Sequence, residues 1–499
     1  MKQIIDRAKS AKSWFERQQN TFGLPFLACI CAVYFAQGFR TLSGLHCQLY
    51  LKDTLGMDPG KMQALLSLSG LPWSLKPLYG LVSDAYPLFG QHRKSYLMLG
   101  AVIGSIAWIG LAILAKSHSG GDEDGSSKST SPLLFLLILS NLSTALSDVM
   151  VDAMVAEKAA SLAATANAKK KDDGIMEDGD NFSATEGENA LQSLCWSSLA
   201  IGGLSSSIIG VVLPSSVPTW IIFLLTASCP LIVFFASMPL VEKRSGGDDG
   251  GGTTIDNIGG ILARCTDLIR ALRMPQVHLP LSFFFLQNAL VPSCHGIMLF
   301  FLTEKLGFTT AFMSANGVVA YIALLLGSAF GGGGEKGSLS FRSIFFRCQL
   351  ALAVLSLADL ILVLRLNVRF GIPDVVFVLG TDAISSVLSR VALQPFLLIS
   401  ARLCPKGCEA SLFAFFMSTW NLGNTASGTL GAAVMGLLGV SKDDYTRLPL
   451  LLLVRTVCML LPLPLVGVLI KEGGDGDDGE KDKKEEKVKG KGEVKMKGV

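Results

Sequence analysis

Twelve stretches of about 20 predominantly apolar residues run through the chain, and they restrict its fold more than any other feature. Half of the 499 residues are hydrophobic and 17% are charged, whereas an average soluble domain carries about 25% charged residues. The sequence therefore predicts an all-α integral membrane protein with twelve transmembrane helices in contact with the lipid bilayer. The predicted spans are 24–50, 62–82, 96–115, 132–156, 190–213, 218–240, 277–302, 312–331, 341–364, 373–400, 409–439 and 447–470.

The distribution of lysine and arginine between the spans predicts the orientation of the chain. An even number of spans places both termini on one side of the membrane. The turn 83–95, the loop 157–189 and the linker 241–276 lie on that same side and hold most of the basic residues. Because basic loops stay in the cytoplasm, we expect both termini to be cytoplasmic. Plasma membrane and organelle (plastid) envelope remain equally open as locations.

The chain divides into five parts by composition. The Gly-, Ser- and charge-rich stretches 120–131 and 244–260 and the charged tail are typical of disordered linkers and ends. The predicted parts are a cytoplasmic N-terminal segment 1–23, a six-helix half 24–240, a cytoplasmic linker 241–276, a second six-helix half 277–470 and a disordered cytoplasmic tail 471–499.

The two halves carry the same short motifs in the same order. Gln37 is followed 18 residues later by Leu55-Gly56, and Gln287 is followed 19 residues later by Leu306-Gly307. Two parallel six-helix halves with a site between them near the midplane are the major-facilitator architecture, which the sequence therefore predicts. A further set of small residues repeats at a constant offset of 221, namely Gly202, Ser206 and Gly210 opposite Gly423, Ser427 and Gly431.

Ionisable residues inside the spans are candidates for function, because each costs about 2.5–3.5 kcal/mol at the centre of a membrane helix. Asp148 and Asp152 are four residues apart and lie on one face of their helix. Two carboxylates so close repel each other, which favours the binding of a proton by one of them. Asp382 and Arg390 belong to a polar stripe in the span 373–400.

These polar stripes line either a water-filled cavity or the surfaces of neighbouring helices. For the acids and Arg390, the alternative to a cavity is a structural ion pair between the halves. Carboxylates, amides and an arginine suit a flat polar heterocycle with an anionic tail, which is compatible with a pterin or folate but also with a nucleobase or an amino acid. The predicted substrate-binding residues are Gln37, Arg40, Asp148, Asp152, Asp382, Ser386, Arg390 and Asn421.

A second group of charged residues lies nearer the predicted cytoplasmic ends. In the stretch 71–96, an apolar helix with Lys76-Pro77 leaves the bilayer around Asp84, turns through the basic loop 92–94 and re-enters the membrane as the next span. We expect this group to form a gate that holds the helices together in one state of a carrier. Its members are Lys76, Asp84, Arg93 and Glu157.

The sequence argues against most other functions. The net charge of +3 is too small to indicate nucleic-acid binding. The eleven cysteines lack the spacing of metal ligands, and the chain has no HExxH, nucleophile elbow, phosphate-binding loop or cofactor fingerprint. We therefore expect no enzyme, no cofactor and no metal. A membrane receptor remains an alternative, although the sequence indicates no folded domain outside the membrane.

Several sequence blocks together resemble the folate–biopterin transporter family of the major facilitator superfamily. The resemblance implies a secondary carrier that moves folates or reduced pterins and is coupled to protons. We also expect a monomer, because the major-facilitator architecture does not need partner chains. By the same resemblance, Lys76, Asp84, Asp148, Asp152 and Arg390 occupy family motif positions. The blocks are YFAQG at 34–38, LPWSLKPLYGLVSDAYP at 71–87, RKSYL at 93–97, SDVMVDAMVAEKA at 147–159, DAISSVLSRVALQPFLLISARLCPKG at 382–407 and LFAFFMSTWNLG at 412–423.

Overall fold

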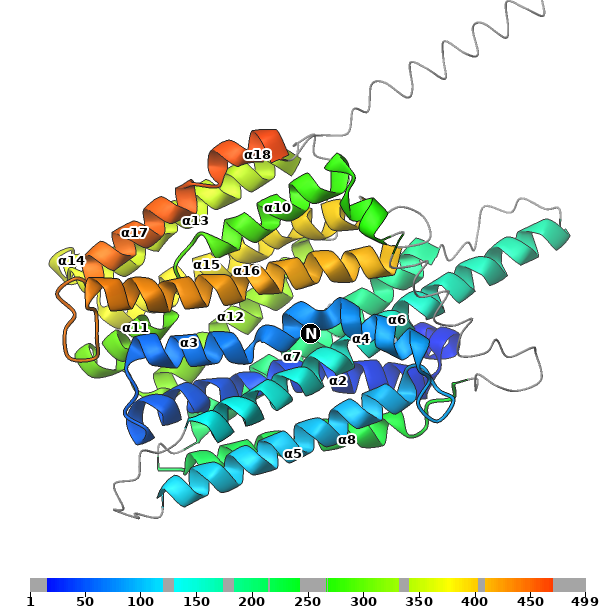
Figure 1. Ribbon diagram of the computed structural model, residues 1–499, viewed down its shortest axis with the longest axis horizontal. Helices are drawn as coiled ribbons and strands as arrows, with labels where there is room; N and C mark the ends of the chain where they lie inside the picture. Colours follow the sequence, from blue (N-terminus) through cyan, green and yellow to red (C-terminus); the bar gives the residue numbers. More distant parts are fainter. Residues whose placement is uncertain are drawn as a thin grey trace, which may run out of the picture.

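A computed structural model describes residues 16–119, 130–173, 184–213, 216–242, 266, 268–331, 341–402 and 409–469. Within these residues the chain is almost entirely helical, and the helices lie side by side along the longest axis of the molecule (Figure 1). The predicted all-helical fold is therefore confirmed. The predicted tail 471–499, the stretch 244–260 and most of the linker 241–276 lie outside the described residues.

The first half begins with an apolar helix that has a proline in its first turn, a position where the missing N–H costs no hydrogen bond. The predicted span 62–82 is in fact interrupted, because Leu71 precedes Pro72 and is disfavoured from the α conformation. The elements are α2 (Leu24–Leu49), the π-helical turn η1 (Tyr50–Thr54), α3 (Pro59–Ser69), the 3₁₀ turn η2 (Leu71–Leu75), α4 (Lys76–Ala85), α5 (Lys94–Ser119), α6 (Ser131–Asp173), α7 (Ala184–Val212) and α8 (Thr219–Ser237).

The second half also contains broken spans. The predicted span 277–302 stops between Ala289 and His295, where Pro292 interrupts the backbone, and the last span bends at Pro462. The elements are α10 (Pro275–Ala289), α11 (His295–Phe300), the π-helical turn η3 (Phe301–Lys305), α12 (Thr310–Gly331), α13 (Phe341–Val363), α14 (Leu366–Arg369), α15 (Asp374–Arg402), α16 (Glu409–Leu438), α17 (Leu448–Leu460) and α18 (Leu463–Leu469).

In the described part of the chain, eight helices are long and apolar enough to cross a membrane. Large apolar side chains such as Ile106 and Ile113 are 58% and 66% exposed on α5, as expected of a surface that faces lipid. The protein is therefore a multi-pass membrane protein. The number of twelve spans remains a prediction, since breaks and polar residues shorten the apolar runs of the other helices.

The motif repeat of the two halves is visible in the backbone. The amide of Leu55 donates to the carbonyl of Tyr50 at 3.0 Å, and that of Leu306 donates to the carbonyl of Phe301 at 3.2 Å. The following glycines both adopt positive φ, +60° at Gly56 and +67° at Gly307, which side chains other than glycine rarely tolerate. The Leu-Gly pair is thus the end of a π-helical turn in each half.

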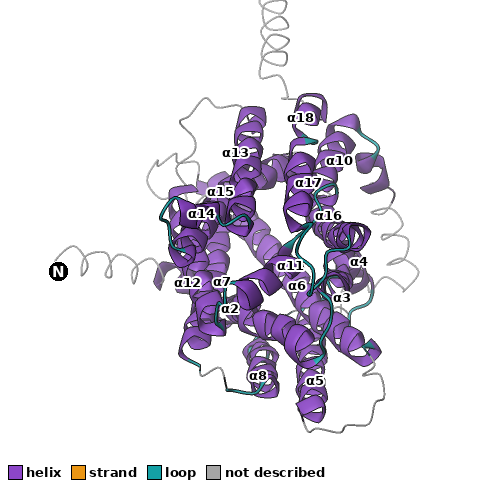
Figure 2. Ribbon diagram, turned by 90° about the vertical axis from the view of Figure 1, so that its left-hand side faces the viewer, coloured by secondary structure: helices purple, strands orange, loops and turns teal. Residues whose placement is uncertain are grey.

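Small residues decide which helices approach most closely. A Cβ on Gly38 would overlap the carbonyl of Leu199, so α2 and α7 pack backbone to backbone. Similarly, a Cβ on Gly423 of α16 would lie 3.0 Å from the carbonyl of Phe285 of α10. The halves meet through α7 against α12 and through α3, η2 and α4 against α16. Figure 2, which looks along the helices, places α5 and α8 at one edge of the bundle and α13 and α18 at the opposite edge.

We name the two ends of the bundle by the first half. The proximal end is where α2 begins and α4 ends, at the right of Figure 1. The distal end is where α2 continues through η1 towards α3, at the left of Figure 1.

Candidate functional site

A ladder of polar pairs joins the antiparallel helices α2 and α6. The Tyr34 hydroxyl donates to Asp152 Oδ1 at 2.6 Å, and Gln37 Nε2 donates to Asp148 Oδ1 at 2.7 Å. One turn further on, Arg40 Nη1 donates to the Thr144 hydroxyl at 2.6 Å. Since residues three to four apart share one face of a helix, the ladder aligns all the polar groups between the two helices. We call these three pairs the polar ladder.

The break at η2 brings a third helix to the polar ladder. Lys76, the first residue of α4, forms an ion pair through its Nζ with Asp148 Oδ2. Only 9% of the Lys76 side chain and 8% of the Asp148 side chain are exposed. Trp73 in η2 donates from Nε1 to Asn141 Oδ1 at 3.1 Å. Both Asp148 oxygens are therefore occupied, one by Gln37 and one by a cation, as a buried carboxylate requires.

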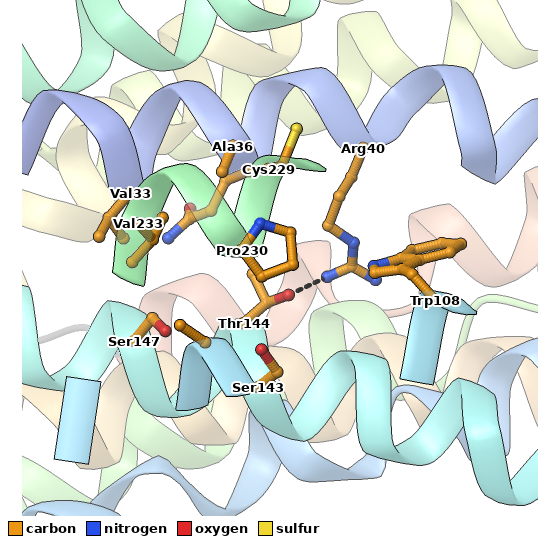
Figure 3. Close-up of a pocket in the computed structure, with 12 residues that line it drawn as sticks. Val33, Ala36, Arg40, Trp108, Ser143, Thr144, Ser147, Cys229, Pro230 and Val233 are labelled. Carbon is orange, nitrogen blue, oxygen red and sulfur yellow. Dashed lines mark hydrogen bonds between the residues drawn. The ribbon is translucent and has the colours of Figure 1, made fainter. Parts of the chain in front are cut away.

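Arg40 lies in a small cavity between α2, α5, α6 and α8. Figure 3 shows its guanidinium directed at Thr144, with Trp108 alongside at 5.8 Å from the ring centroid. Its second hydrogen bond, from Nη2 to Asn141 Oδ1, is 3.2 Å long. These partners are neutral, so Arg40 keeps its positive charge at the end of the polar ladder. The cavity is lined by Val33, Ala36, Gln37, Arg40, Ala101, Trp108, Ser143, Thr144, Ser147, Cys229, Pro230 and Val233.

Asp152 differs from Asp148 in its surroundings. Its side chain is exposed, and within the described residues it accepts a hydrogen bond from Tyr34 but forms no ion pair. The two acids on one face of α6 thus have separate partners. Asp148 is buried and neutralised by Lys76, while Asp152 is the more exposed acid and is hydrogen-bonded to Tyr34.

In the second half, the structure separates the residues of the predicted stripe on α15. Asp382 accepts a hydrogen bond from Asn316 on α12. Arg390 is 7% exposed, and its guanidinium lies 4.2 Å from the ring centroid of Trp196 on α7, so this contact crosses between the halves. Within the described residues Arg390 has no ion pair, and its Nε has no hydrogen-bond partner. Ser386 is half-buried one turn before Arg390.

Asn421 connects the second half to the break at η2, because its Nδ2 donates to the Trp73 carbonyl at 3.4 Å. The predicted substrate-binding residues of the first half thus meet at one site. Asn421 reaches that site from the other half, whereas Asp382 lies with Asn316 on its own half. The alternative of ion pairs between the halves does not apply to these acids in the described residues, since Asp148 pairs with Lys76 inside the first half.

Three of the four predicted gate residues come together at the proximal end. Arg93 Nη2 lies 2.6 Å from Asp84 Oδ1 and 2.7 Å from Glu157 Oε1, and its Nη1 donates to Ser83 Oγ at 2.6 Å. Burial lowers the pKa of Arg93, but the two carboxylates outweigh it and hold that pKa above its ordinary value. We call Asp84, Arg93 and Glu157 the arginine cluster. Lys76 lies apart from it, in the polar ladder.

Replacing Arg93 by alanine should lower the free energy of unfolding by about 1–3 kcal/mol, because charged hydrogen bonds are lost. The melting temperature of the purified protein should fall accordingly. The side chain is only 12% exposed and joins α4 to α6. Arg365→Ala is the control, because 45% of that side chain is exposed where it bridges Asp374, and such pairs contribute at most about 1 kcal/mol. Equal melting temperatures for the two variants would contradict a structural role for the arginine cluster.

Several residues of the site were not predicted from the sequence. Tyr34 precedes Gln37 and Arg40 at intervals of three, so its position on their face could have indicated it. Trp73 and Asn141 are uncharged, so the search for ionisable residues inside the spans did not select them. Glu242 was missed because it lies in a loop; its carboxylate accepts from the backbone amides of His92 and Lys94, both at 2.8 Å, and so binds the start of α5 to the end of α8.

Comparisons with known proteins identify the family and the fold of this chain. The BT1 family model matches residues 37–169 and 173–489. The folate-biopterin transporter of Synechocystis sp. is 33% identical over 443 residues, which cover 89% of this chain and 81% of that protein. The probable folate-biopterin transporter 4 of Arabidopsis thaliana is 29% identical over 92% of this chain and 98% of its own length. The crystal structure of a D-xylose-proton symporter superposes with a TM-score of 0.61 at 11% identity, covering 90% of this chain and 98% of the symporter, and therefore shows a shared fold alone.

Proposed function

Since the chain belongs to the BT1 family and is a membrane transporter with no enzymatic role, we propose that it is a secondary carrier of folates or pterins. The observation that carries the proposal is the membrane-embedded site at which α2, α4 and α6 meet, with the buried Lys76–Asp148 pair beside the exposed Asp152. The similarity to proteins named folate-biopterin transporters supports the choice of cargo.

The proposed binding mode follows from the charges of the site. The exposed carboxylate of Asp152 accepts paired hydrogen bonds from the amino-pyrimidinone edge of a pterin ring. Arg390, buried and without an anionic partner in the described residues, binds the carboxylates of a folate tail. Gln37, Arg40, Asp382, Ser386 and Asn421 complete the proposed substrate-binding set, and the ion pair of Lys76 with Asp148 supports a role for that lysine in the same site.

We propose that transport proceeds by alternating access, with 24–240 and 277–470 as the two moving halves of a monomer. The arginine cluster then gates the proximal end, which the positive-inside rule makes cytoplasmic together with both termini. A protease added outside sealed cells tests this orientation. Cleavage of an epitope on the C-terminal tail without lysis would refute it.

The cargo is tested by reconstituting the purified carrier into liposomes and measuring uptake of labelled folate and biopterin. Saturable uptake of either compound, competed by the unlabelled compound, is the expected result. Uptake of neither compound, with uptake of another polar or anionic solute, would make this protein a carrier of a different substrate. Binding of folate or biopterin without net flux would favour a receptor instead.

Asp152→Asn should weaken the exchange of labelled for unlabelled substrate, because an amide can accept only one of the paired hydrogen bonds that the carboxylate accepts, and it should abolish the dependence of the remaining uptake on a proton gradient. The physical reason is that Asp152 is the exposed acid of the pair and forms no ion pair in the described part of the chain, so it is the group that can gain and lose a proton. Uptake is measured with and without a protonophore. An Asp152→Asn carrier that remains as sensitive to the protonophore as the unaltered chain would exclude Asp152 as the coupling residue.

A further inference from the structure

The break between α10 and α11 leaves backbone groups without partners inside a membrane-spanning segment. Such groups need hydrogen bonds, because the hydrocarbon core of a bilayer holds no water to satisfy them. Part of the need is met within the second half. The Ser427 hydroxyl donates to the Val291 carbonyl at 2.6 Å, and the Ser293 amide donates to the Ser427 carbonyl at 3.0 Å.

Gln63 of α3 supplies the remaining partners from the other half. Its Nε2 donates to the Ser293 carbonyl at 2.6 Å, and its Oε1 accepts from the Gly296 amide at 2.8 Å. The same Nε2 also donates to the Gly428 carbonyl of α16 at 3.1 Å. The side chain is 5% exposed. The Gln63 side-chain amide therefore forms all of these hydrogen bonds, two as donor and one as acceptor, with the opposite half of the carrier.

Close packing makes this arrangement specific to a closed distal end. A Cβ on Gly296 would lie 3.0 Å from Gln63 Oε1 and 3.0 Å from the Pro59 carbonyl, closer than most side-chain contacts, so glycine at this position lets α3 and α11 pack tightly. Two weaker contacts cross the halves nearby. Lys52 Nζ lies 3.3 Å from Glu304 Oε1, and Lys442 Nζ donates to the Gly56 carbonyl at 3.4 Å.

We infer that Gln63 is the positioning residue of a distal gate, which it holds closed by completing the hydrogen bonds of the α10–α11 break. The inference rests on the proposed alternating access. When the halves separate at the distal end, Ser293 and Gly296 lose their partners on Gln63, and water must enter the break to replace them. Distal opening is thus coupled to hydration of the broken helix.

The chain contains its own reporter for this opening. Cys294 lies in the break, is 1% exposed and packs in the hydrophobic core of the second half, so a water-soluble maleimide should reach it when water enters the break. Labelling is followed in the purified protein by mass spectrometry of the peptides. Cys29, 0% exposed in the core of the first half, reports general loosening of the fold in the same sample.

Gln63→Met keeps the volume of the side chain but removes its hydrogen bonds, and we expect Cys294 to be labelled at least tenfold faster while Cys29 is unchanged. Gln349→Met is the matched control, because Gln349 is also a buried amide, 6% exposed, but bonds to Gln287 and the Met459 carbonyl inside its own half. Gln63→Glu adds a pH test, since only the protonated carboxyl can donate to a carbonyl. Its labelling rate, divided by the rate of the unaltered chain at the same pH to cancel the loss of reactive thiolate, should fall as the pH is lowered.

Labelling of Cys294 at the unaltered rate in both Gln63 variants would overturn the inference. An equal increase in the labelling rate of Cys294 in Gln349→Met, or a parallel increase in the labelling of Cys29, would also overturn it. Either result would show that Gln63 stabilises the fold in general and does not act on the gate. The measurement needs no substrate. A failure to transport folate or biopterin therefore leaves this test intact, and a failure of this test leaves the proposed cargo untouched.

Discussion

Replacing Lys76 by methionine is expected to abolish transport and to destabilise the carrier by about 3–5 kcal/mol, the cost of leaving one member of a buried ion pair unpaired. Lys76 and Asp148 are each less than one-tenth exposed, and within the described residues Lys76 is the cation that reaches this carboxylate. Gln37 alone, a neutral donor at 2.7 Å, does not replace the lost charge. Uptake into liposomes and thermal melting in detergent measure the two effects.

A double variant separates the two consequences. Lys76→Met combined with Asp148→Asn removes both charges and should recover most of the stability, because no buried charge is left unpaired. Transport should remain absent, since the proposed site then lacks its central ion pair. Arg455→Met with Asp359→Asn is the control, as this pair at 2.7 Å lies in the second half with side chains 21% and 35% exposed. Uptake by the Lys76–Asp148 double variant would show that the pair serves the fold alone.

Arg390→Gln is expected to lower folate uptake by about 10- to 100-fold. This factor corresponds to the contribution of about 1.5–3 kcal/mol that a hydrogen bond to a charged group makes. Biopterin, which lacks the glutamate carboxylates of folate, should be transported nearly as before. The guanidinium is buried against Trp196 at 4.2 Å, and its Nε has no partner in the described residues, as expected of a cation that binds an anionic substrate. Competition between labelled folate and unlabelled biopterin measures the change in preference.

The stability of Arg390→Gln provides the control for a structural role. Removing a buried cation without an anionic partner in the described residues should lower the free energy of unfolding by no more than about 0.5–2 kcal/mol, the contribution of the contact with Trp196. Arg40→Gln should lower the melting temperature more than Arg390→Gln does, because Arg40 donates hydrogen bonds to both Thr144 and Asn141. Equal loss of folate and biopterin uptake in Arg390→Gln, with a large fall in melting temperature, would refute anion binding by this residue.

Much of the architecture was predictable because it depends on local chemistry. Apolar length indicates a membrane helix whatever surrounds it, and in the described residues the predicted spans coincide with helices apart from their breaks, such as those near Pro72 and Pro292. The Leu-Gly motif marked two equivalent turns because Gly56 and Gly307 need positive φ. The interruptions were less visible, since Pro72 and Pro292 lie in stretches that are otherwise apolar and helical in composition.

The sequence by itself therefore determined the helices, the face each polar residue occupies and the repeat of the halves, since these follow from apolar length and from 3.6 residues per turn. Only the tertiary structure decided the partners. Lys76, expected in the gate, pairs instead with Asp148, 72 residues away, and Arg390 stacks on Trp196 and not with Asp382. Gln63 gained its significance in the same way, 230 residues from Ser293. Periodicity defines a face of a helix, but which helix covers that face depends on the close approach of backbones at glycines from distant parts of the chain.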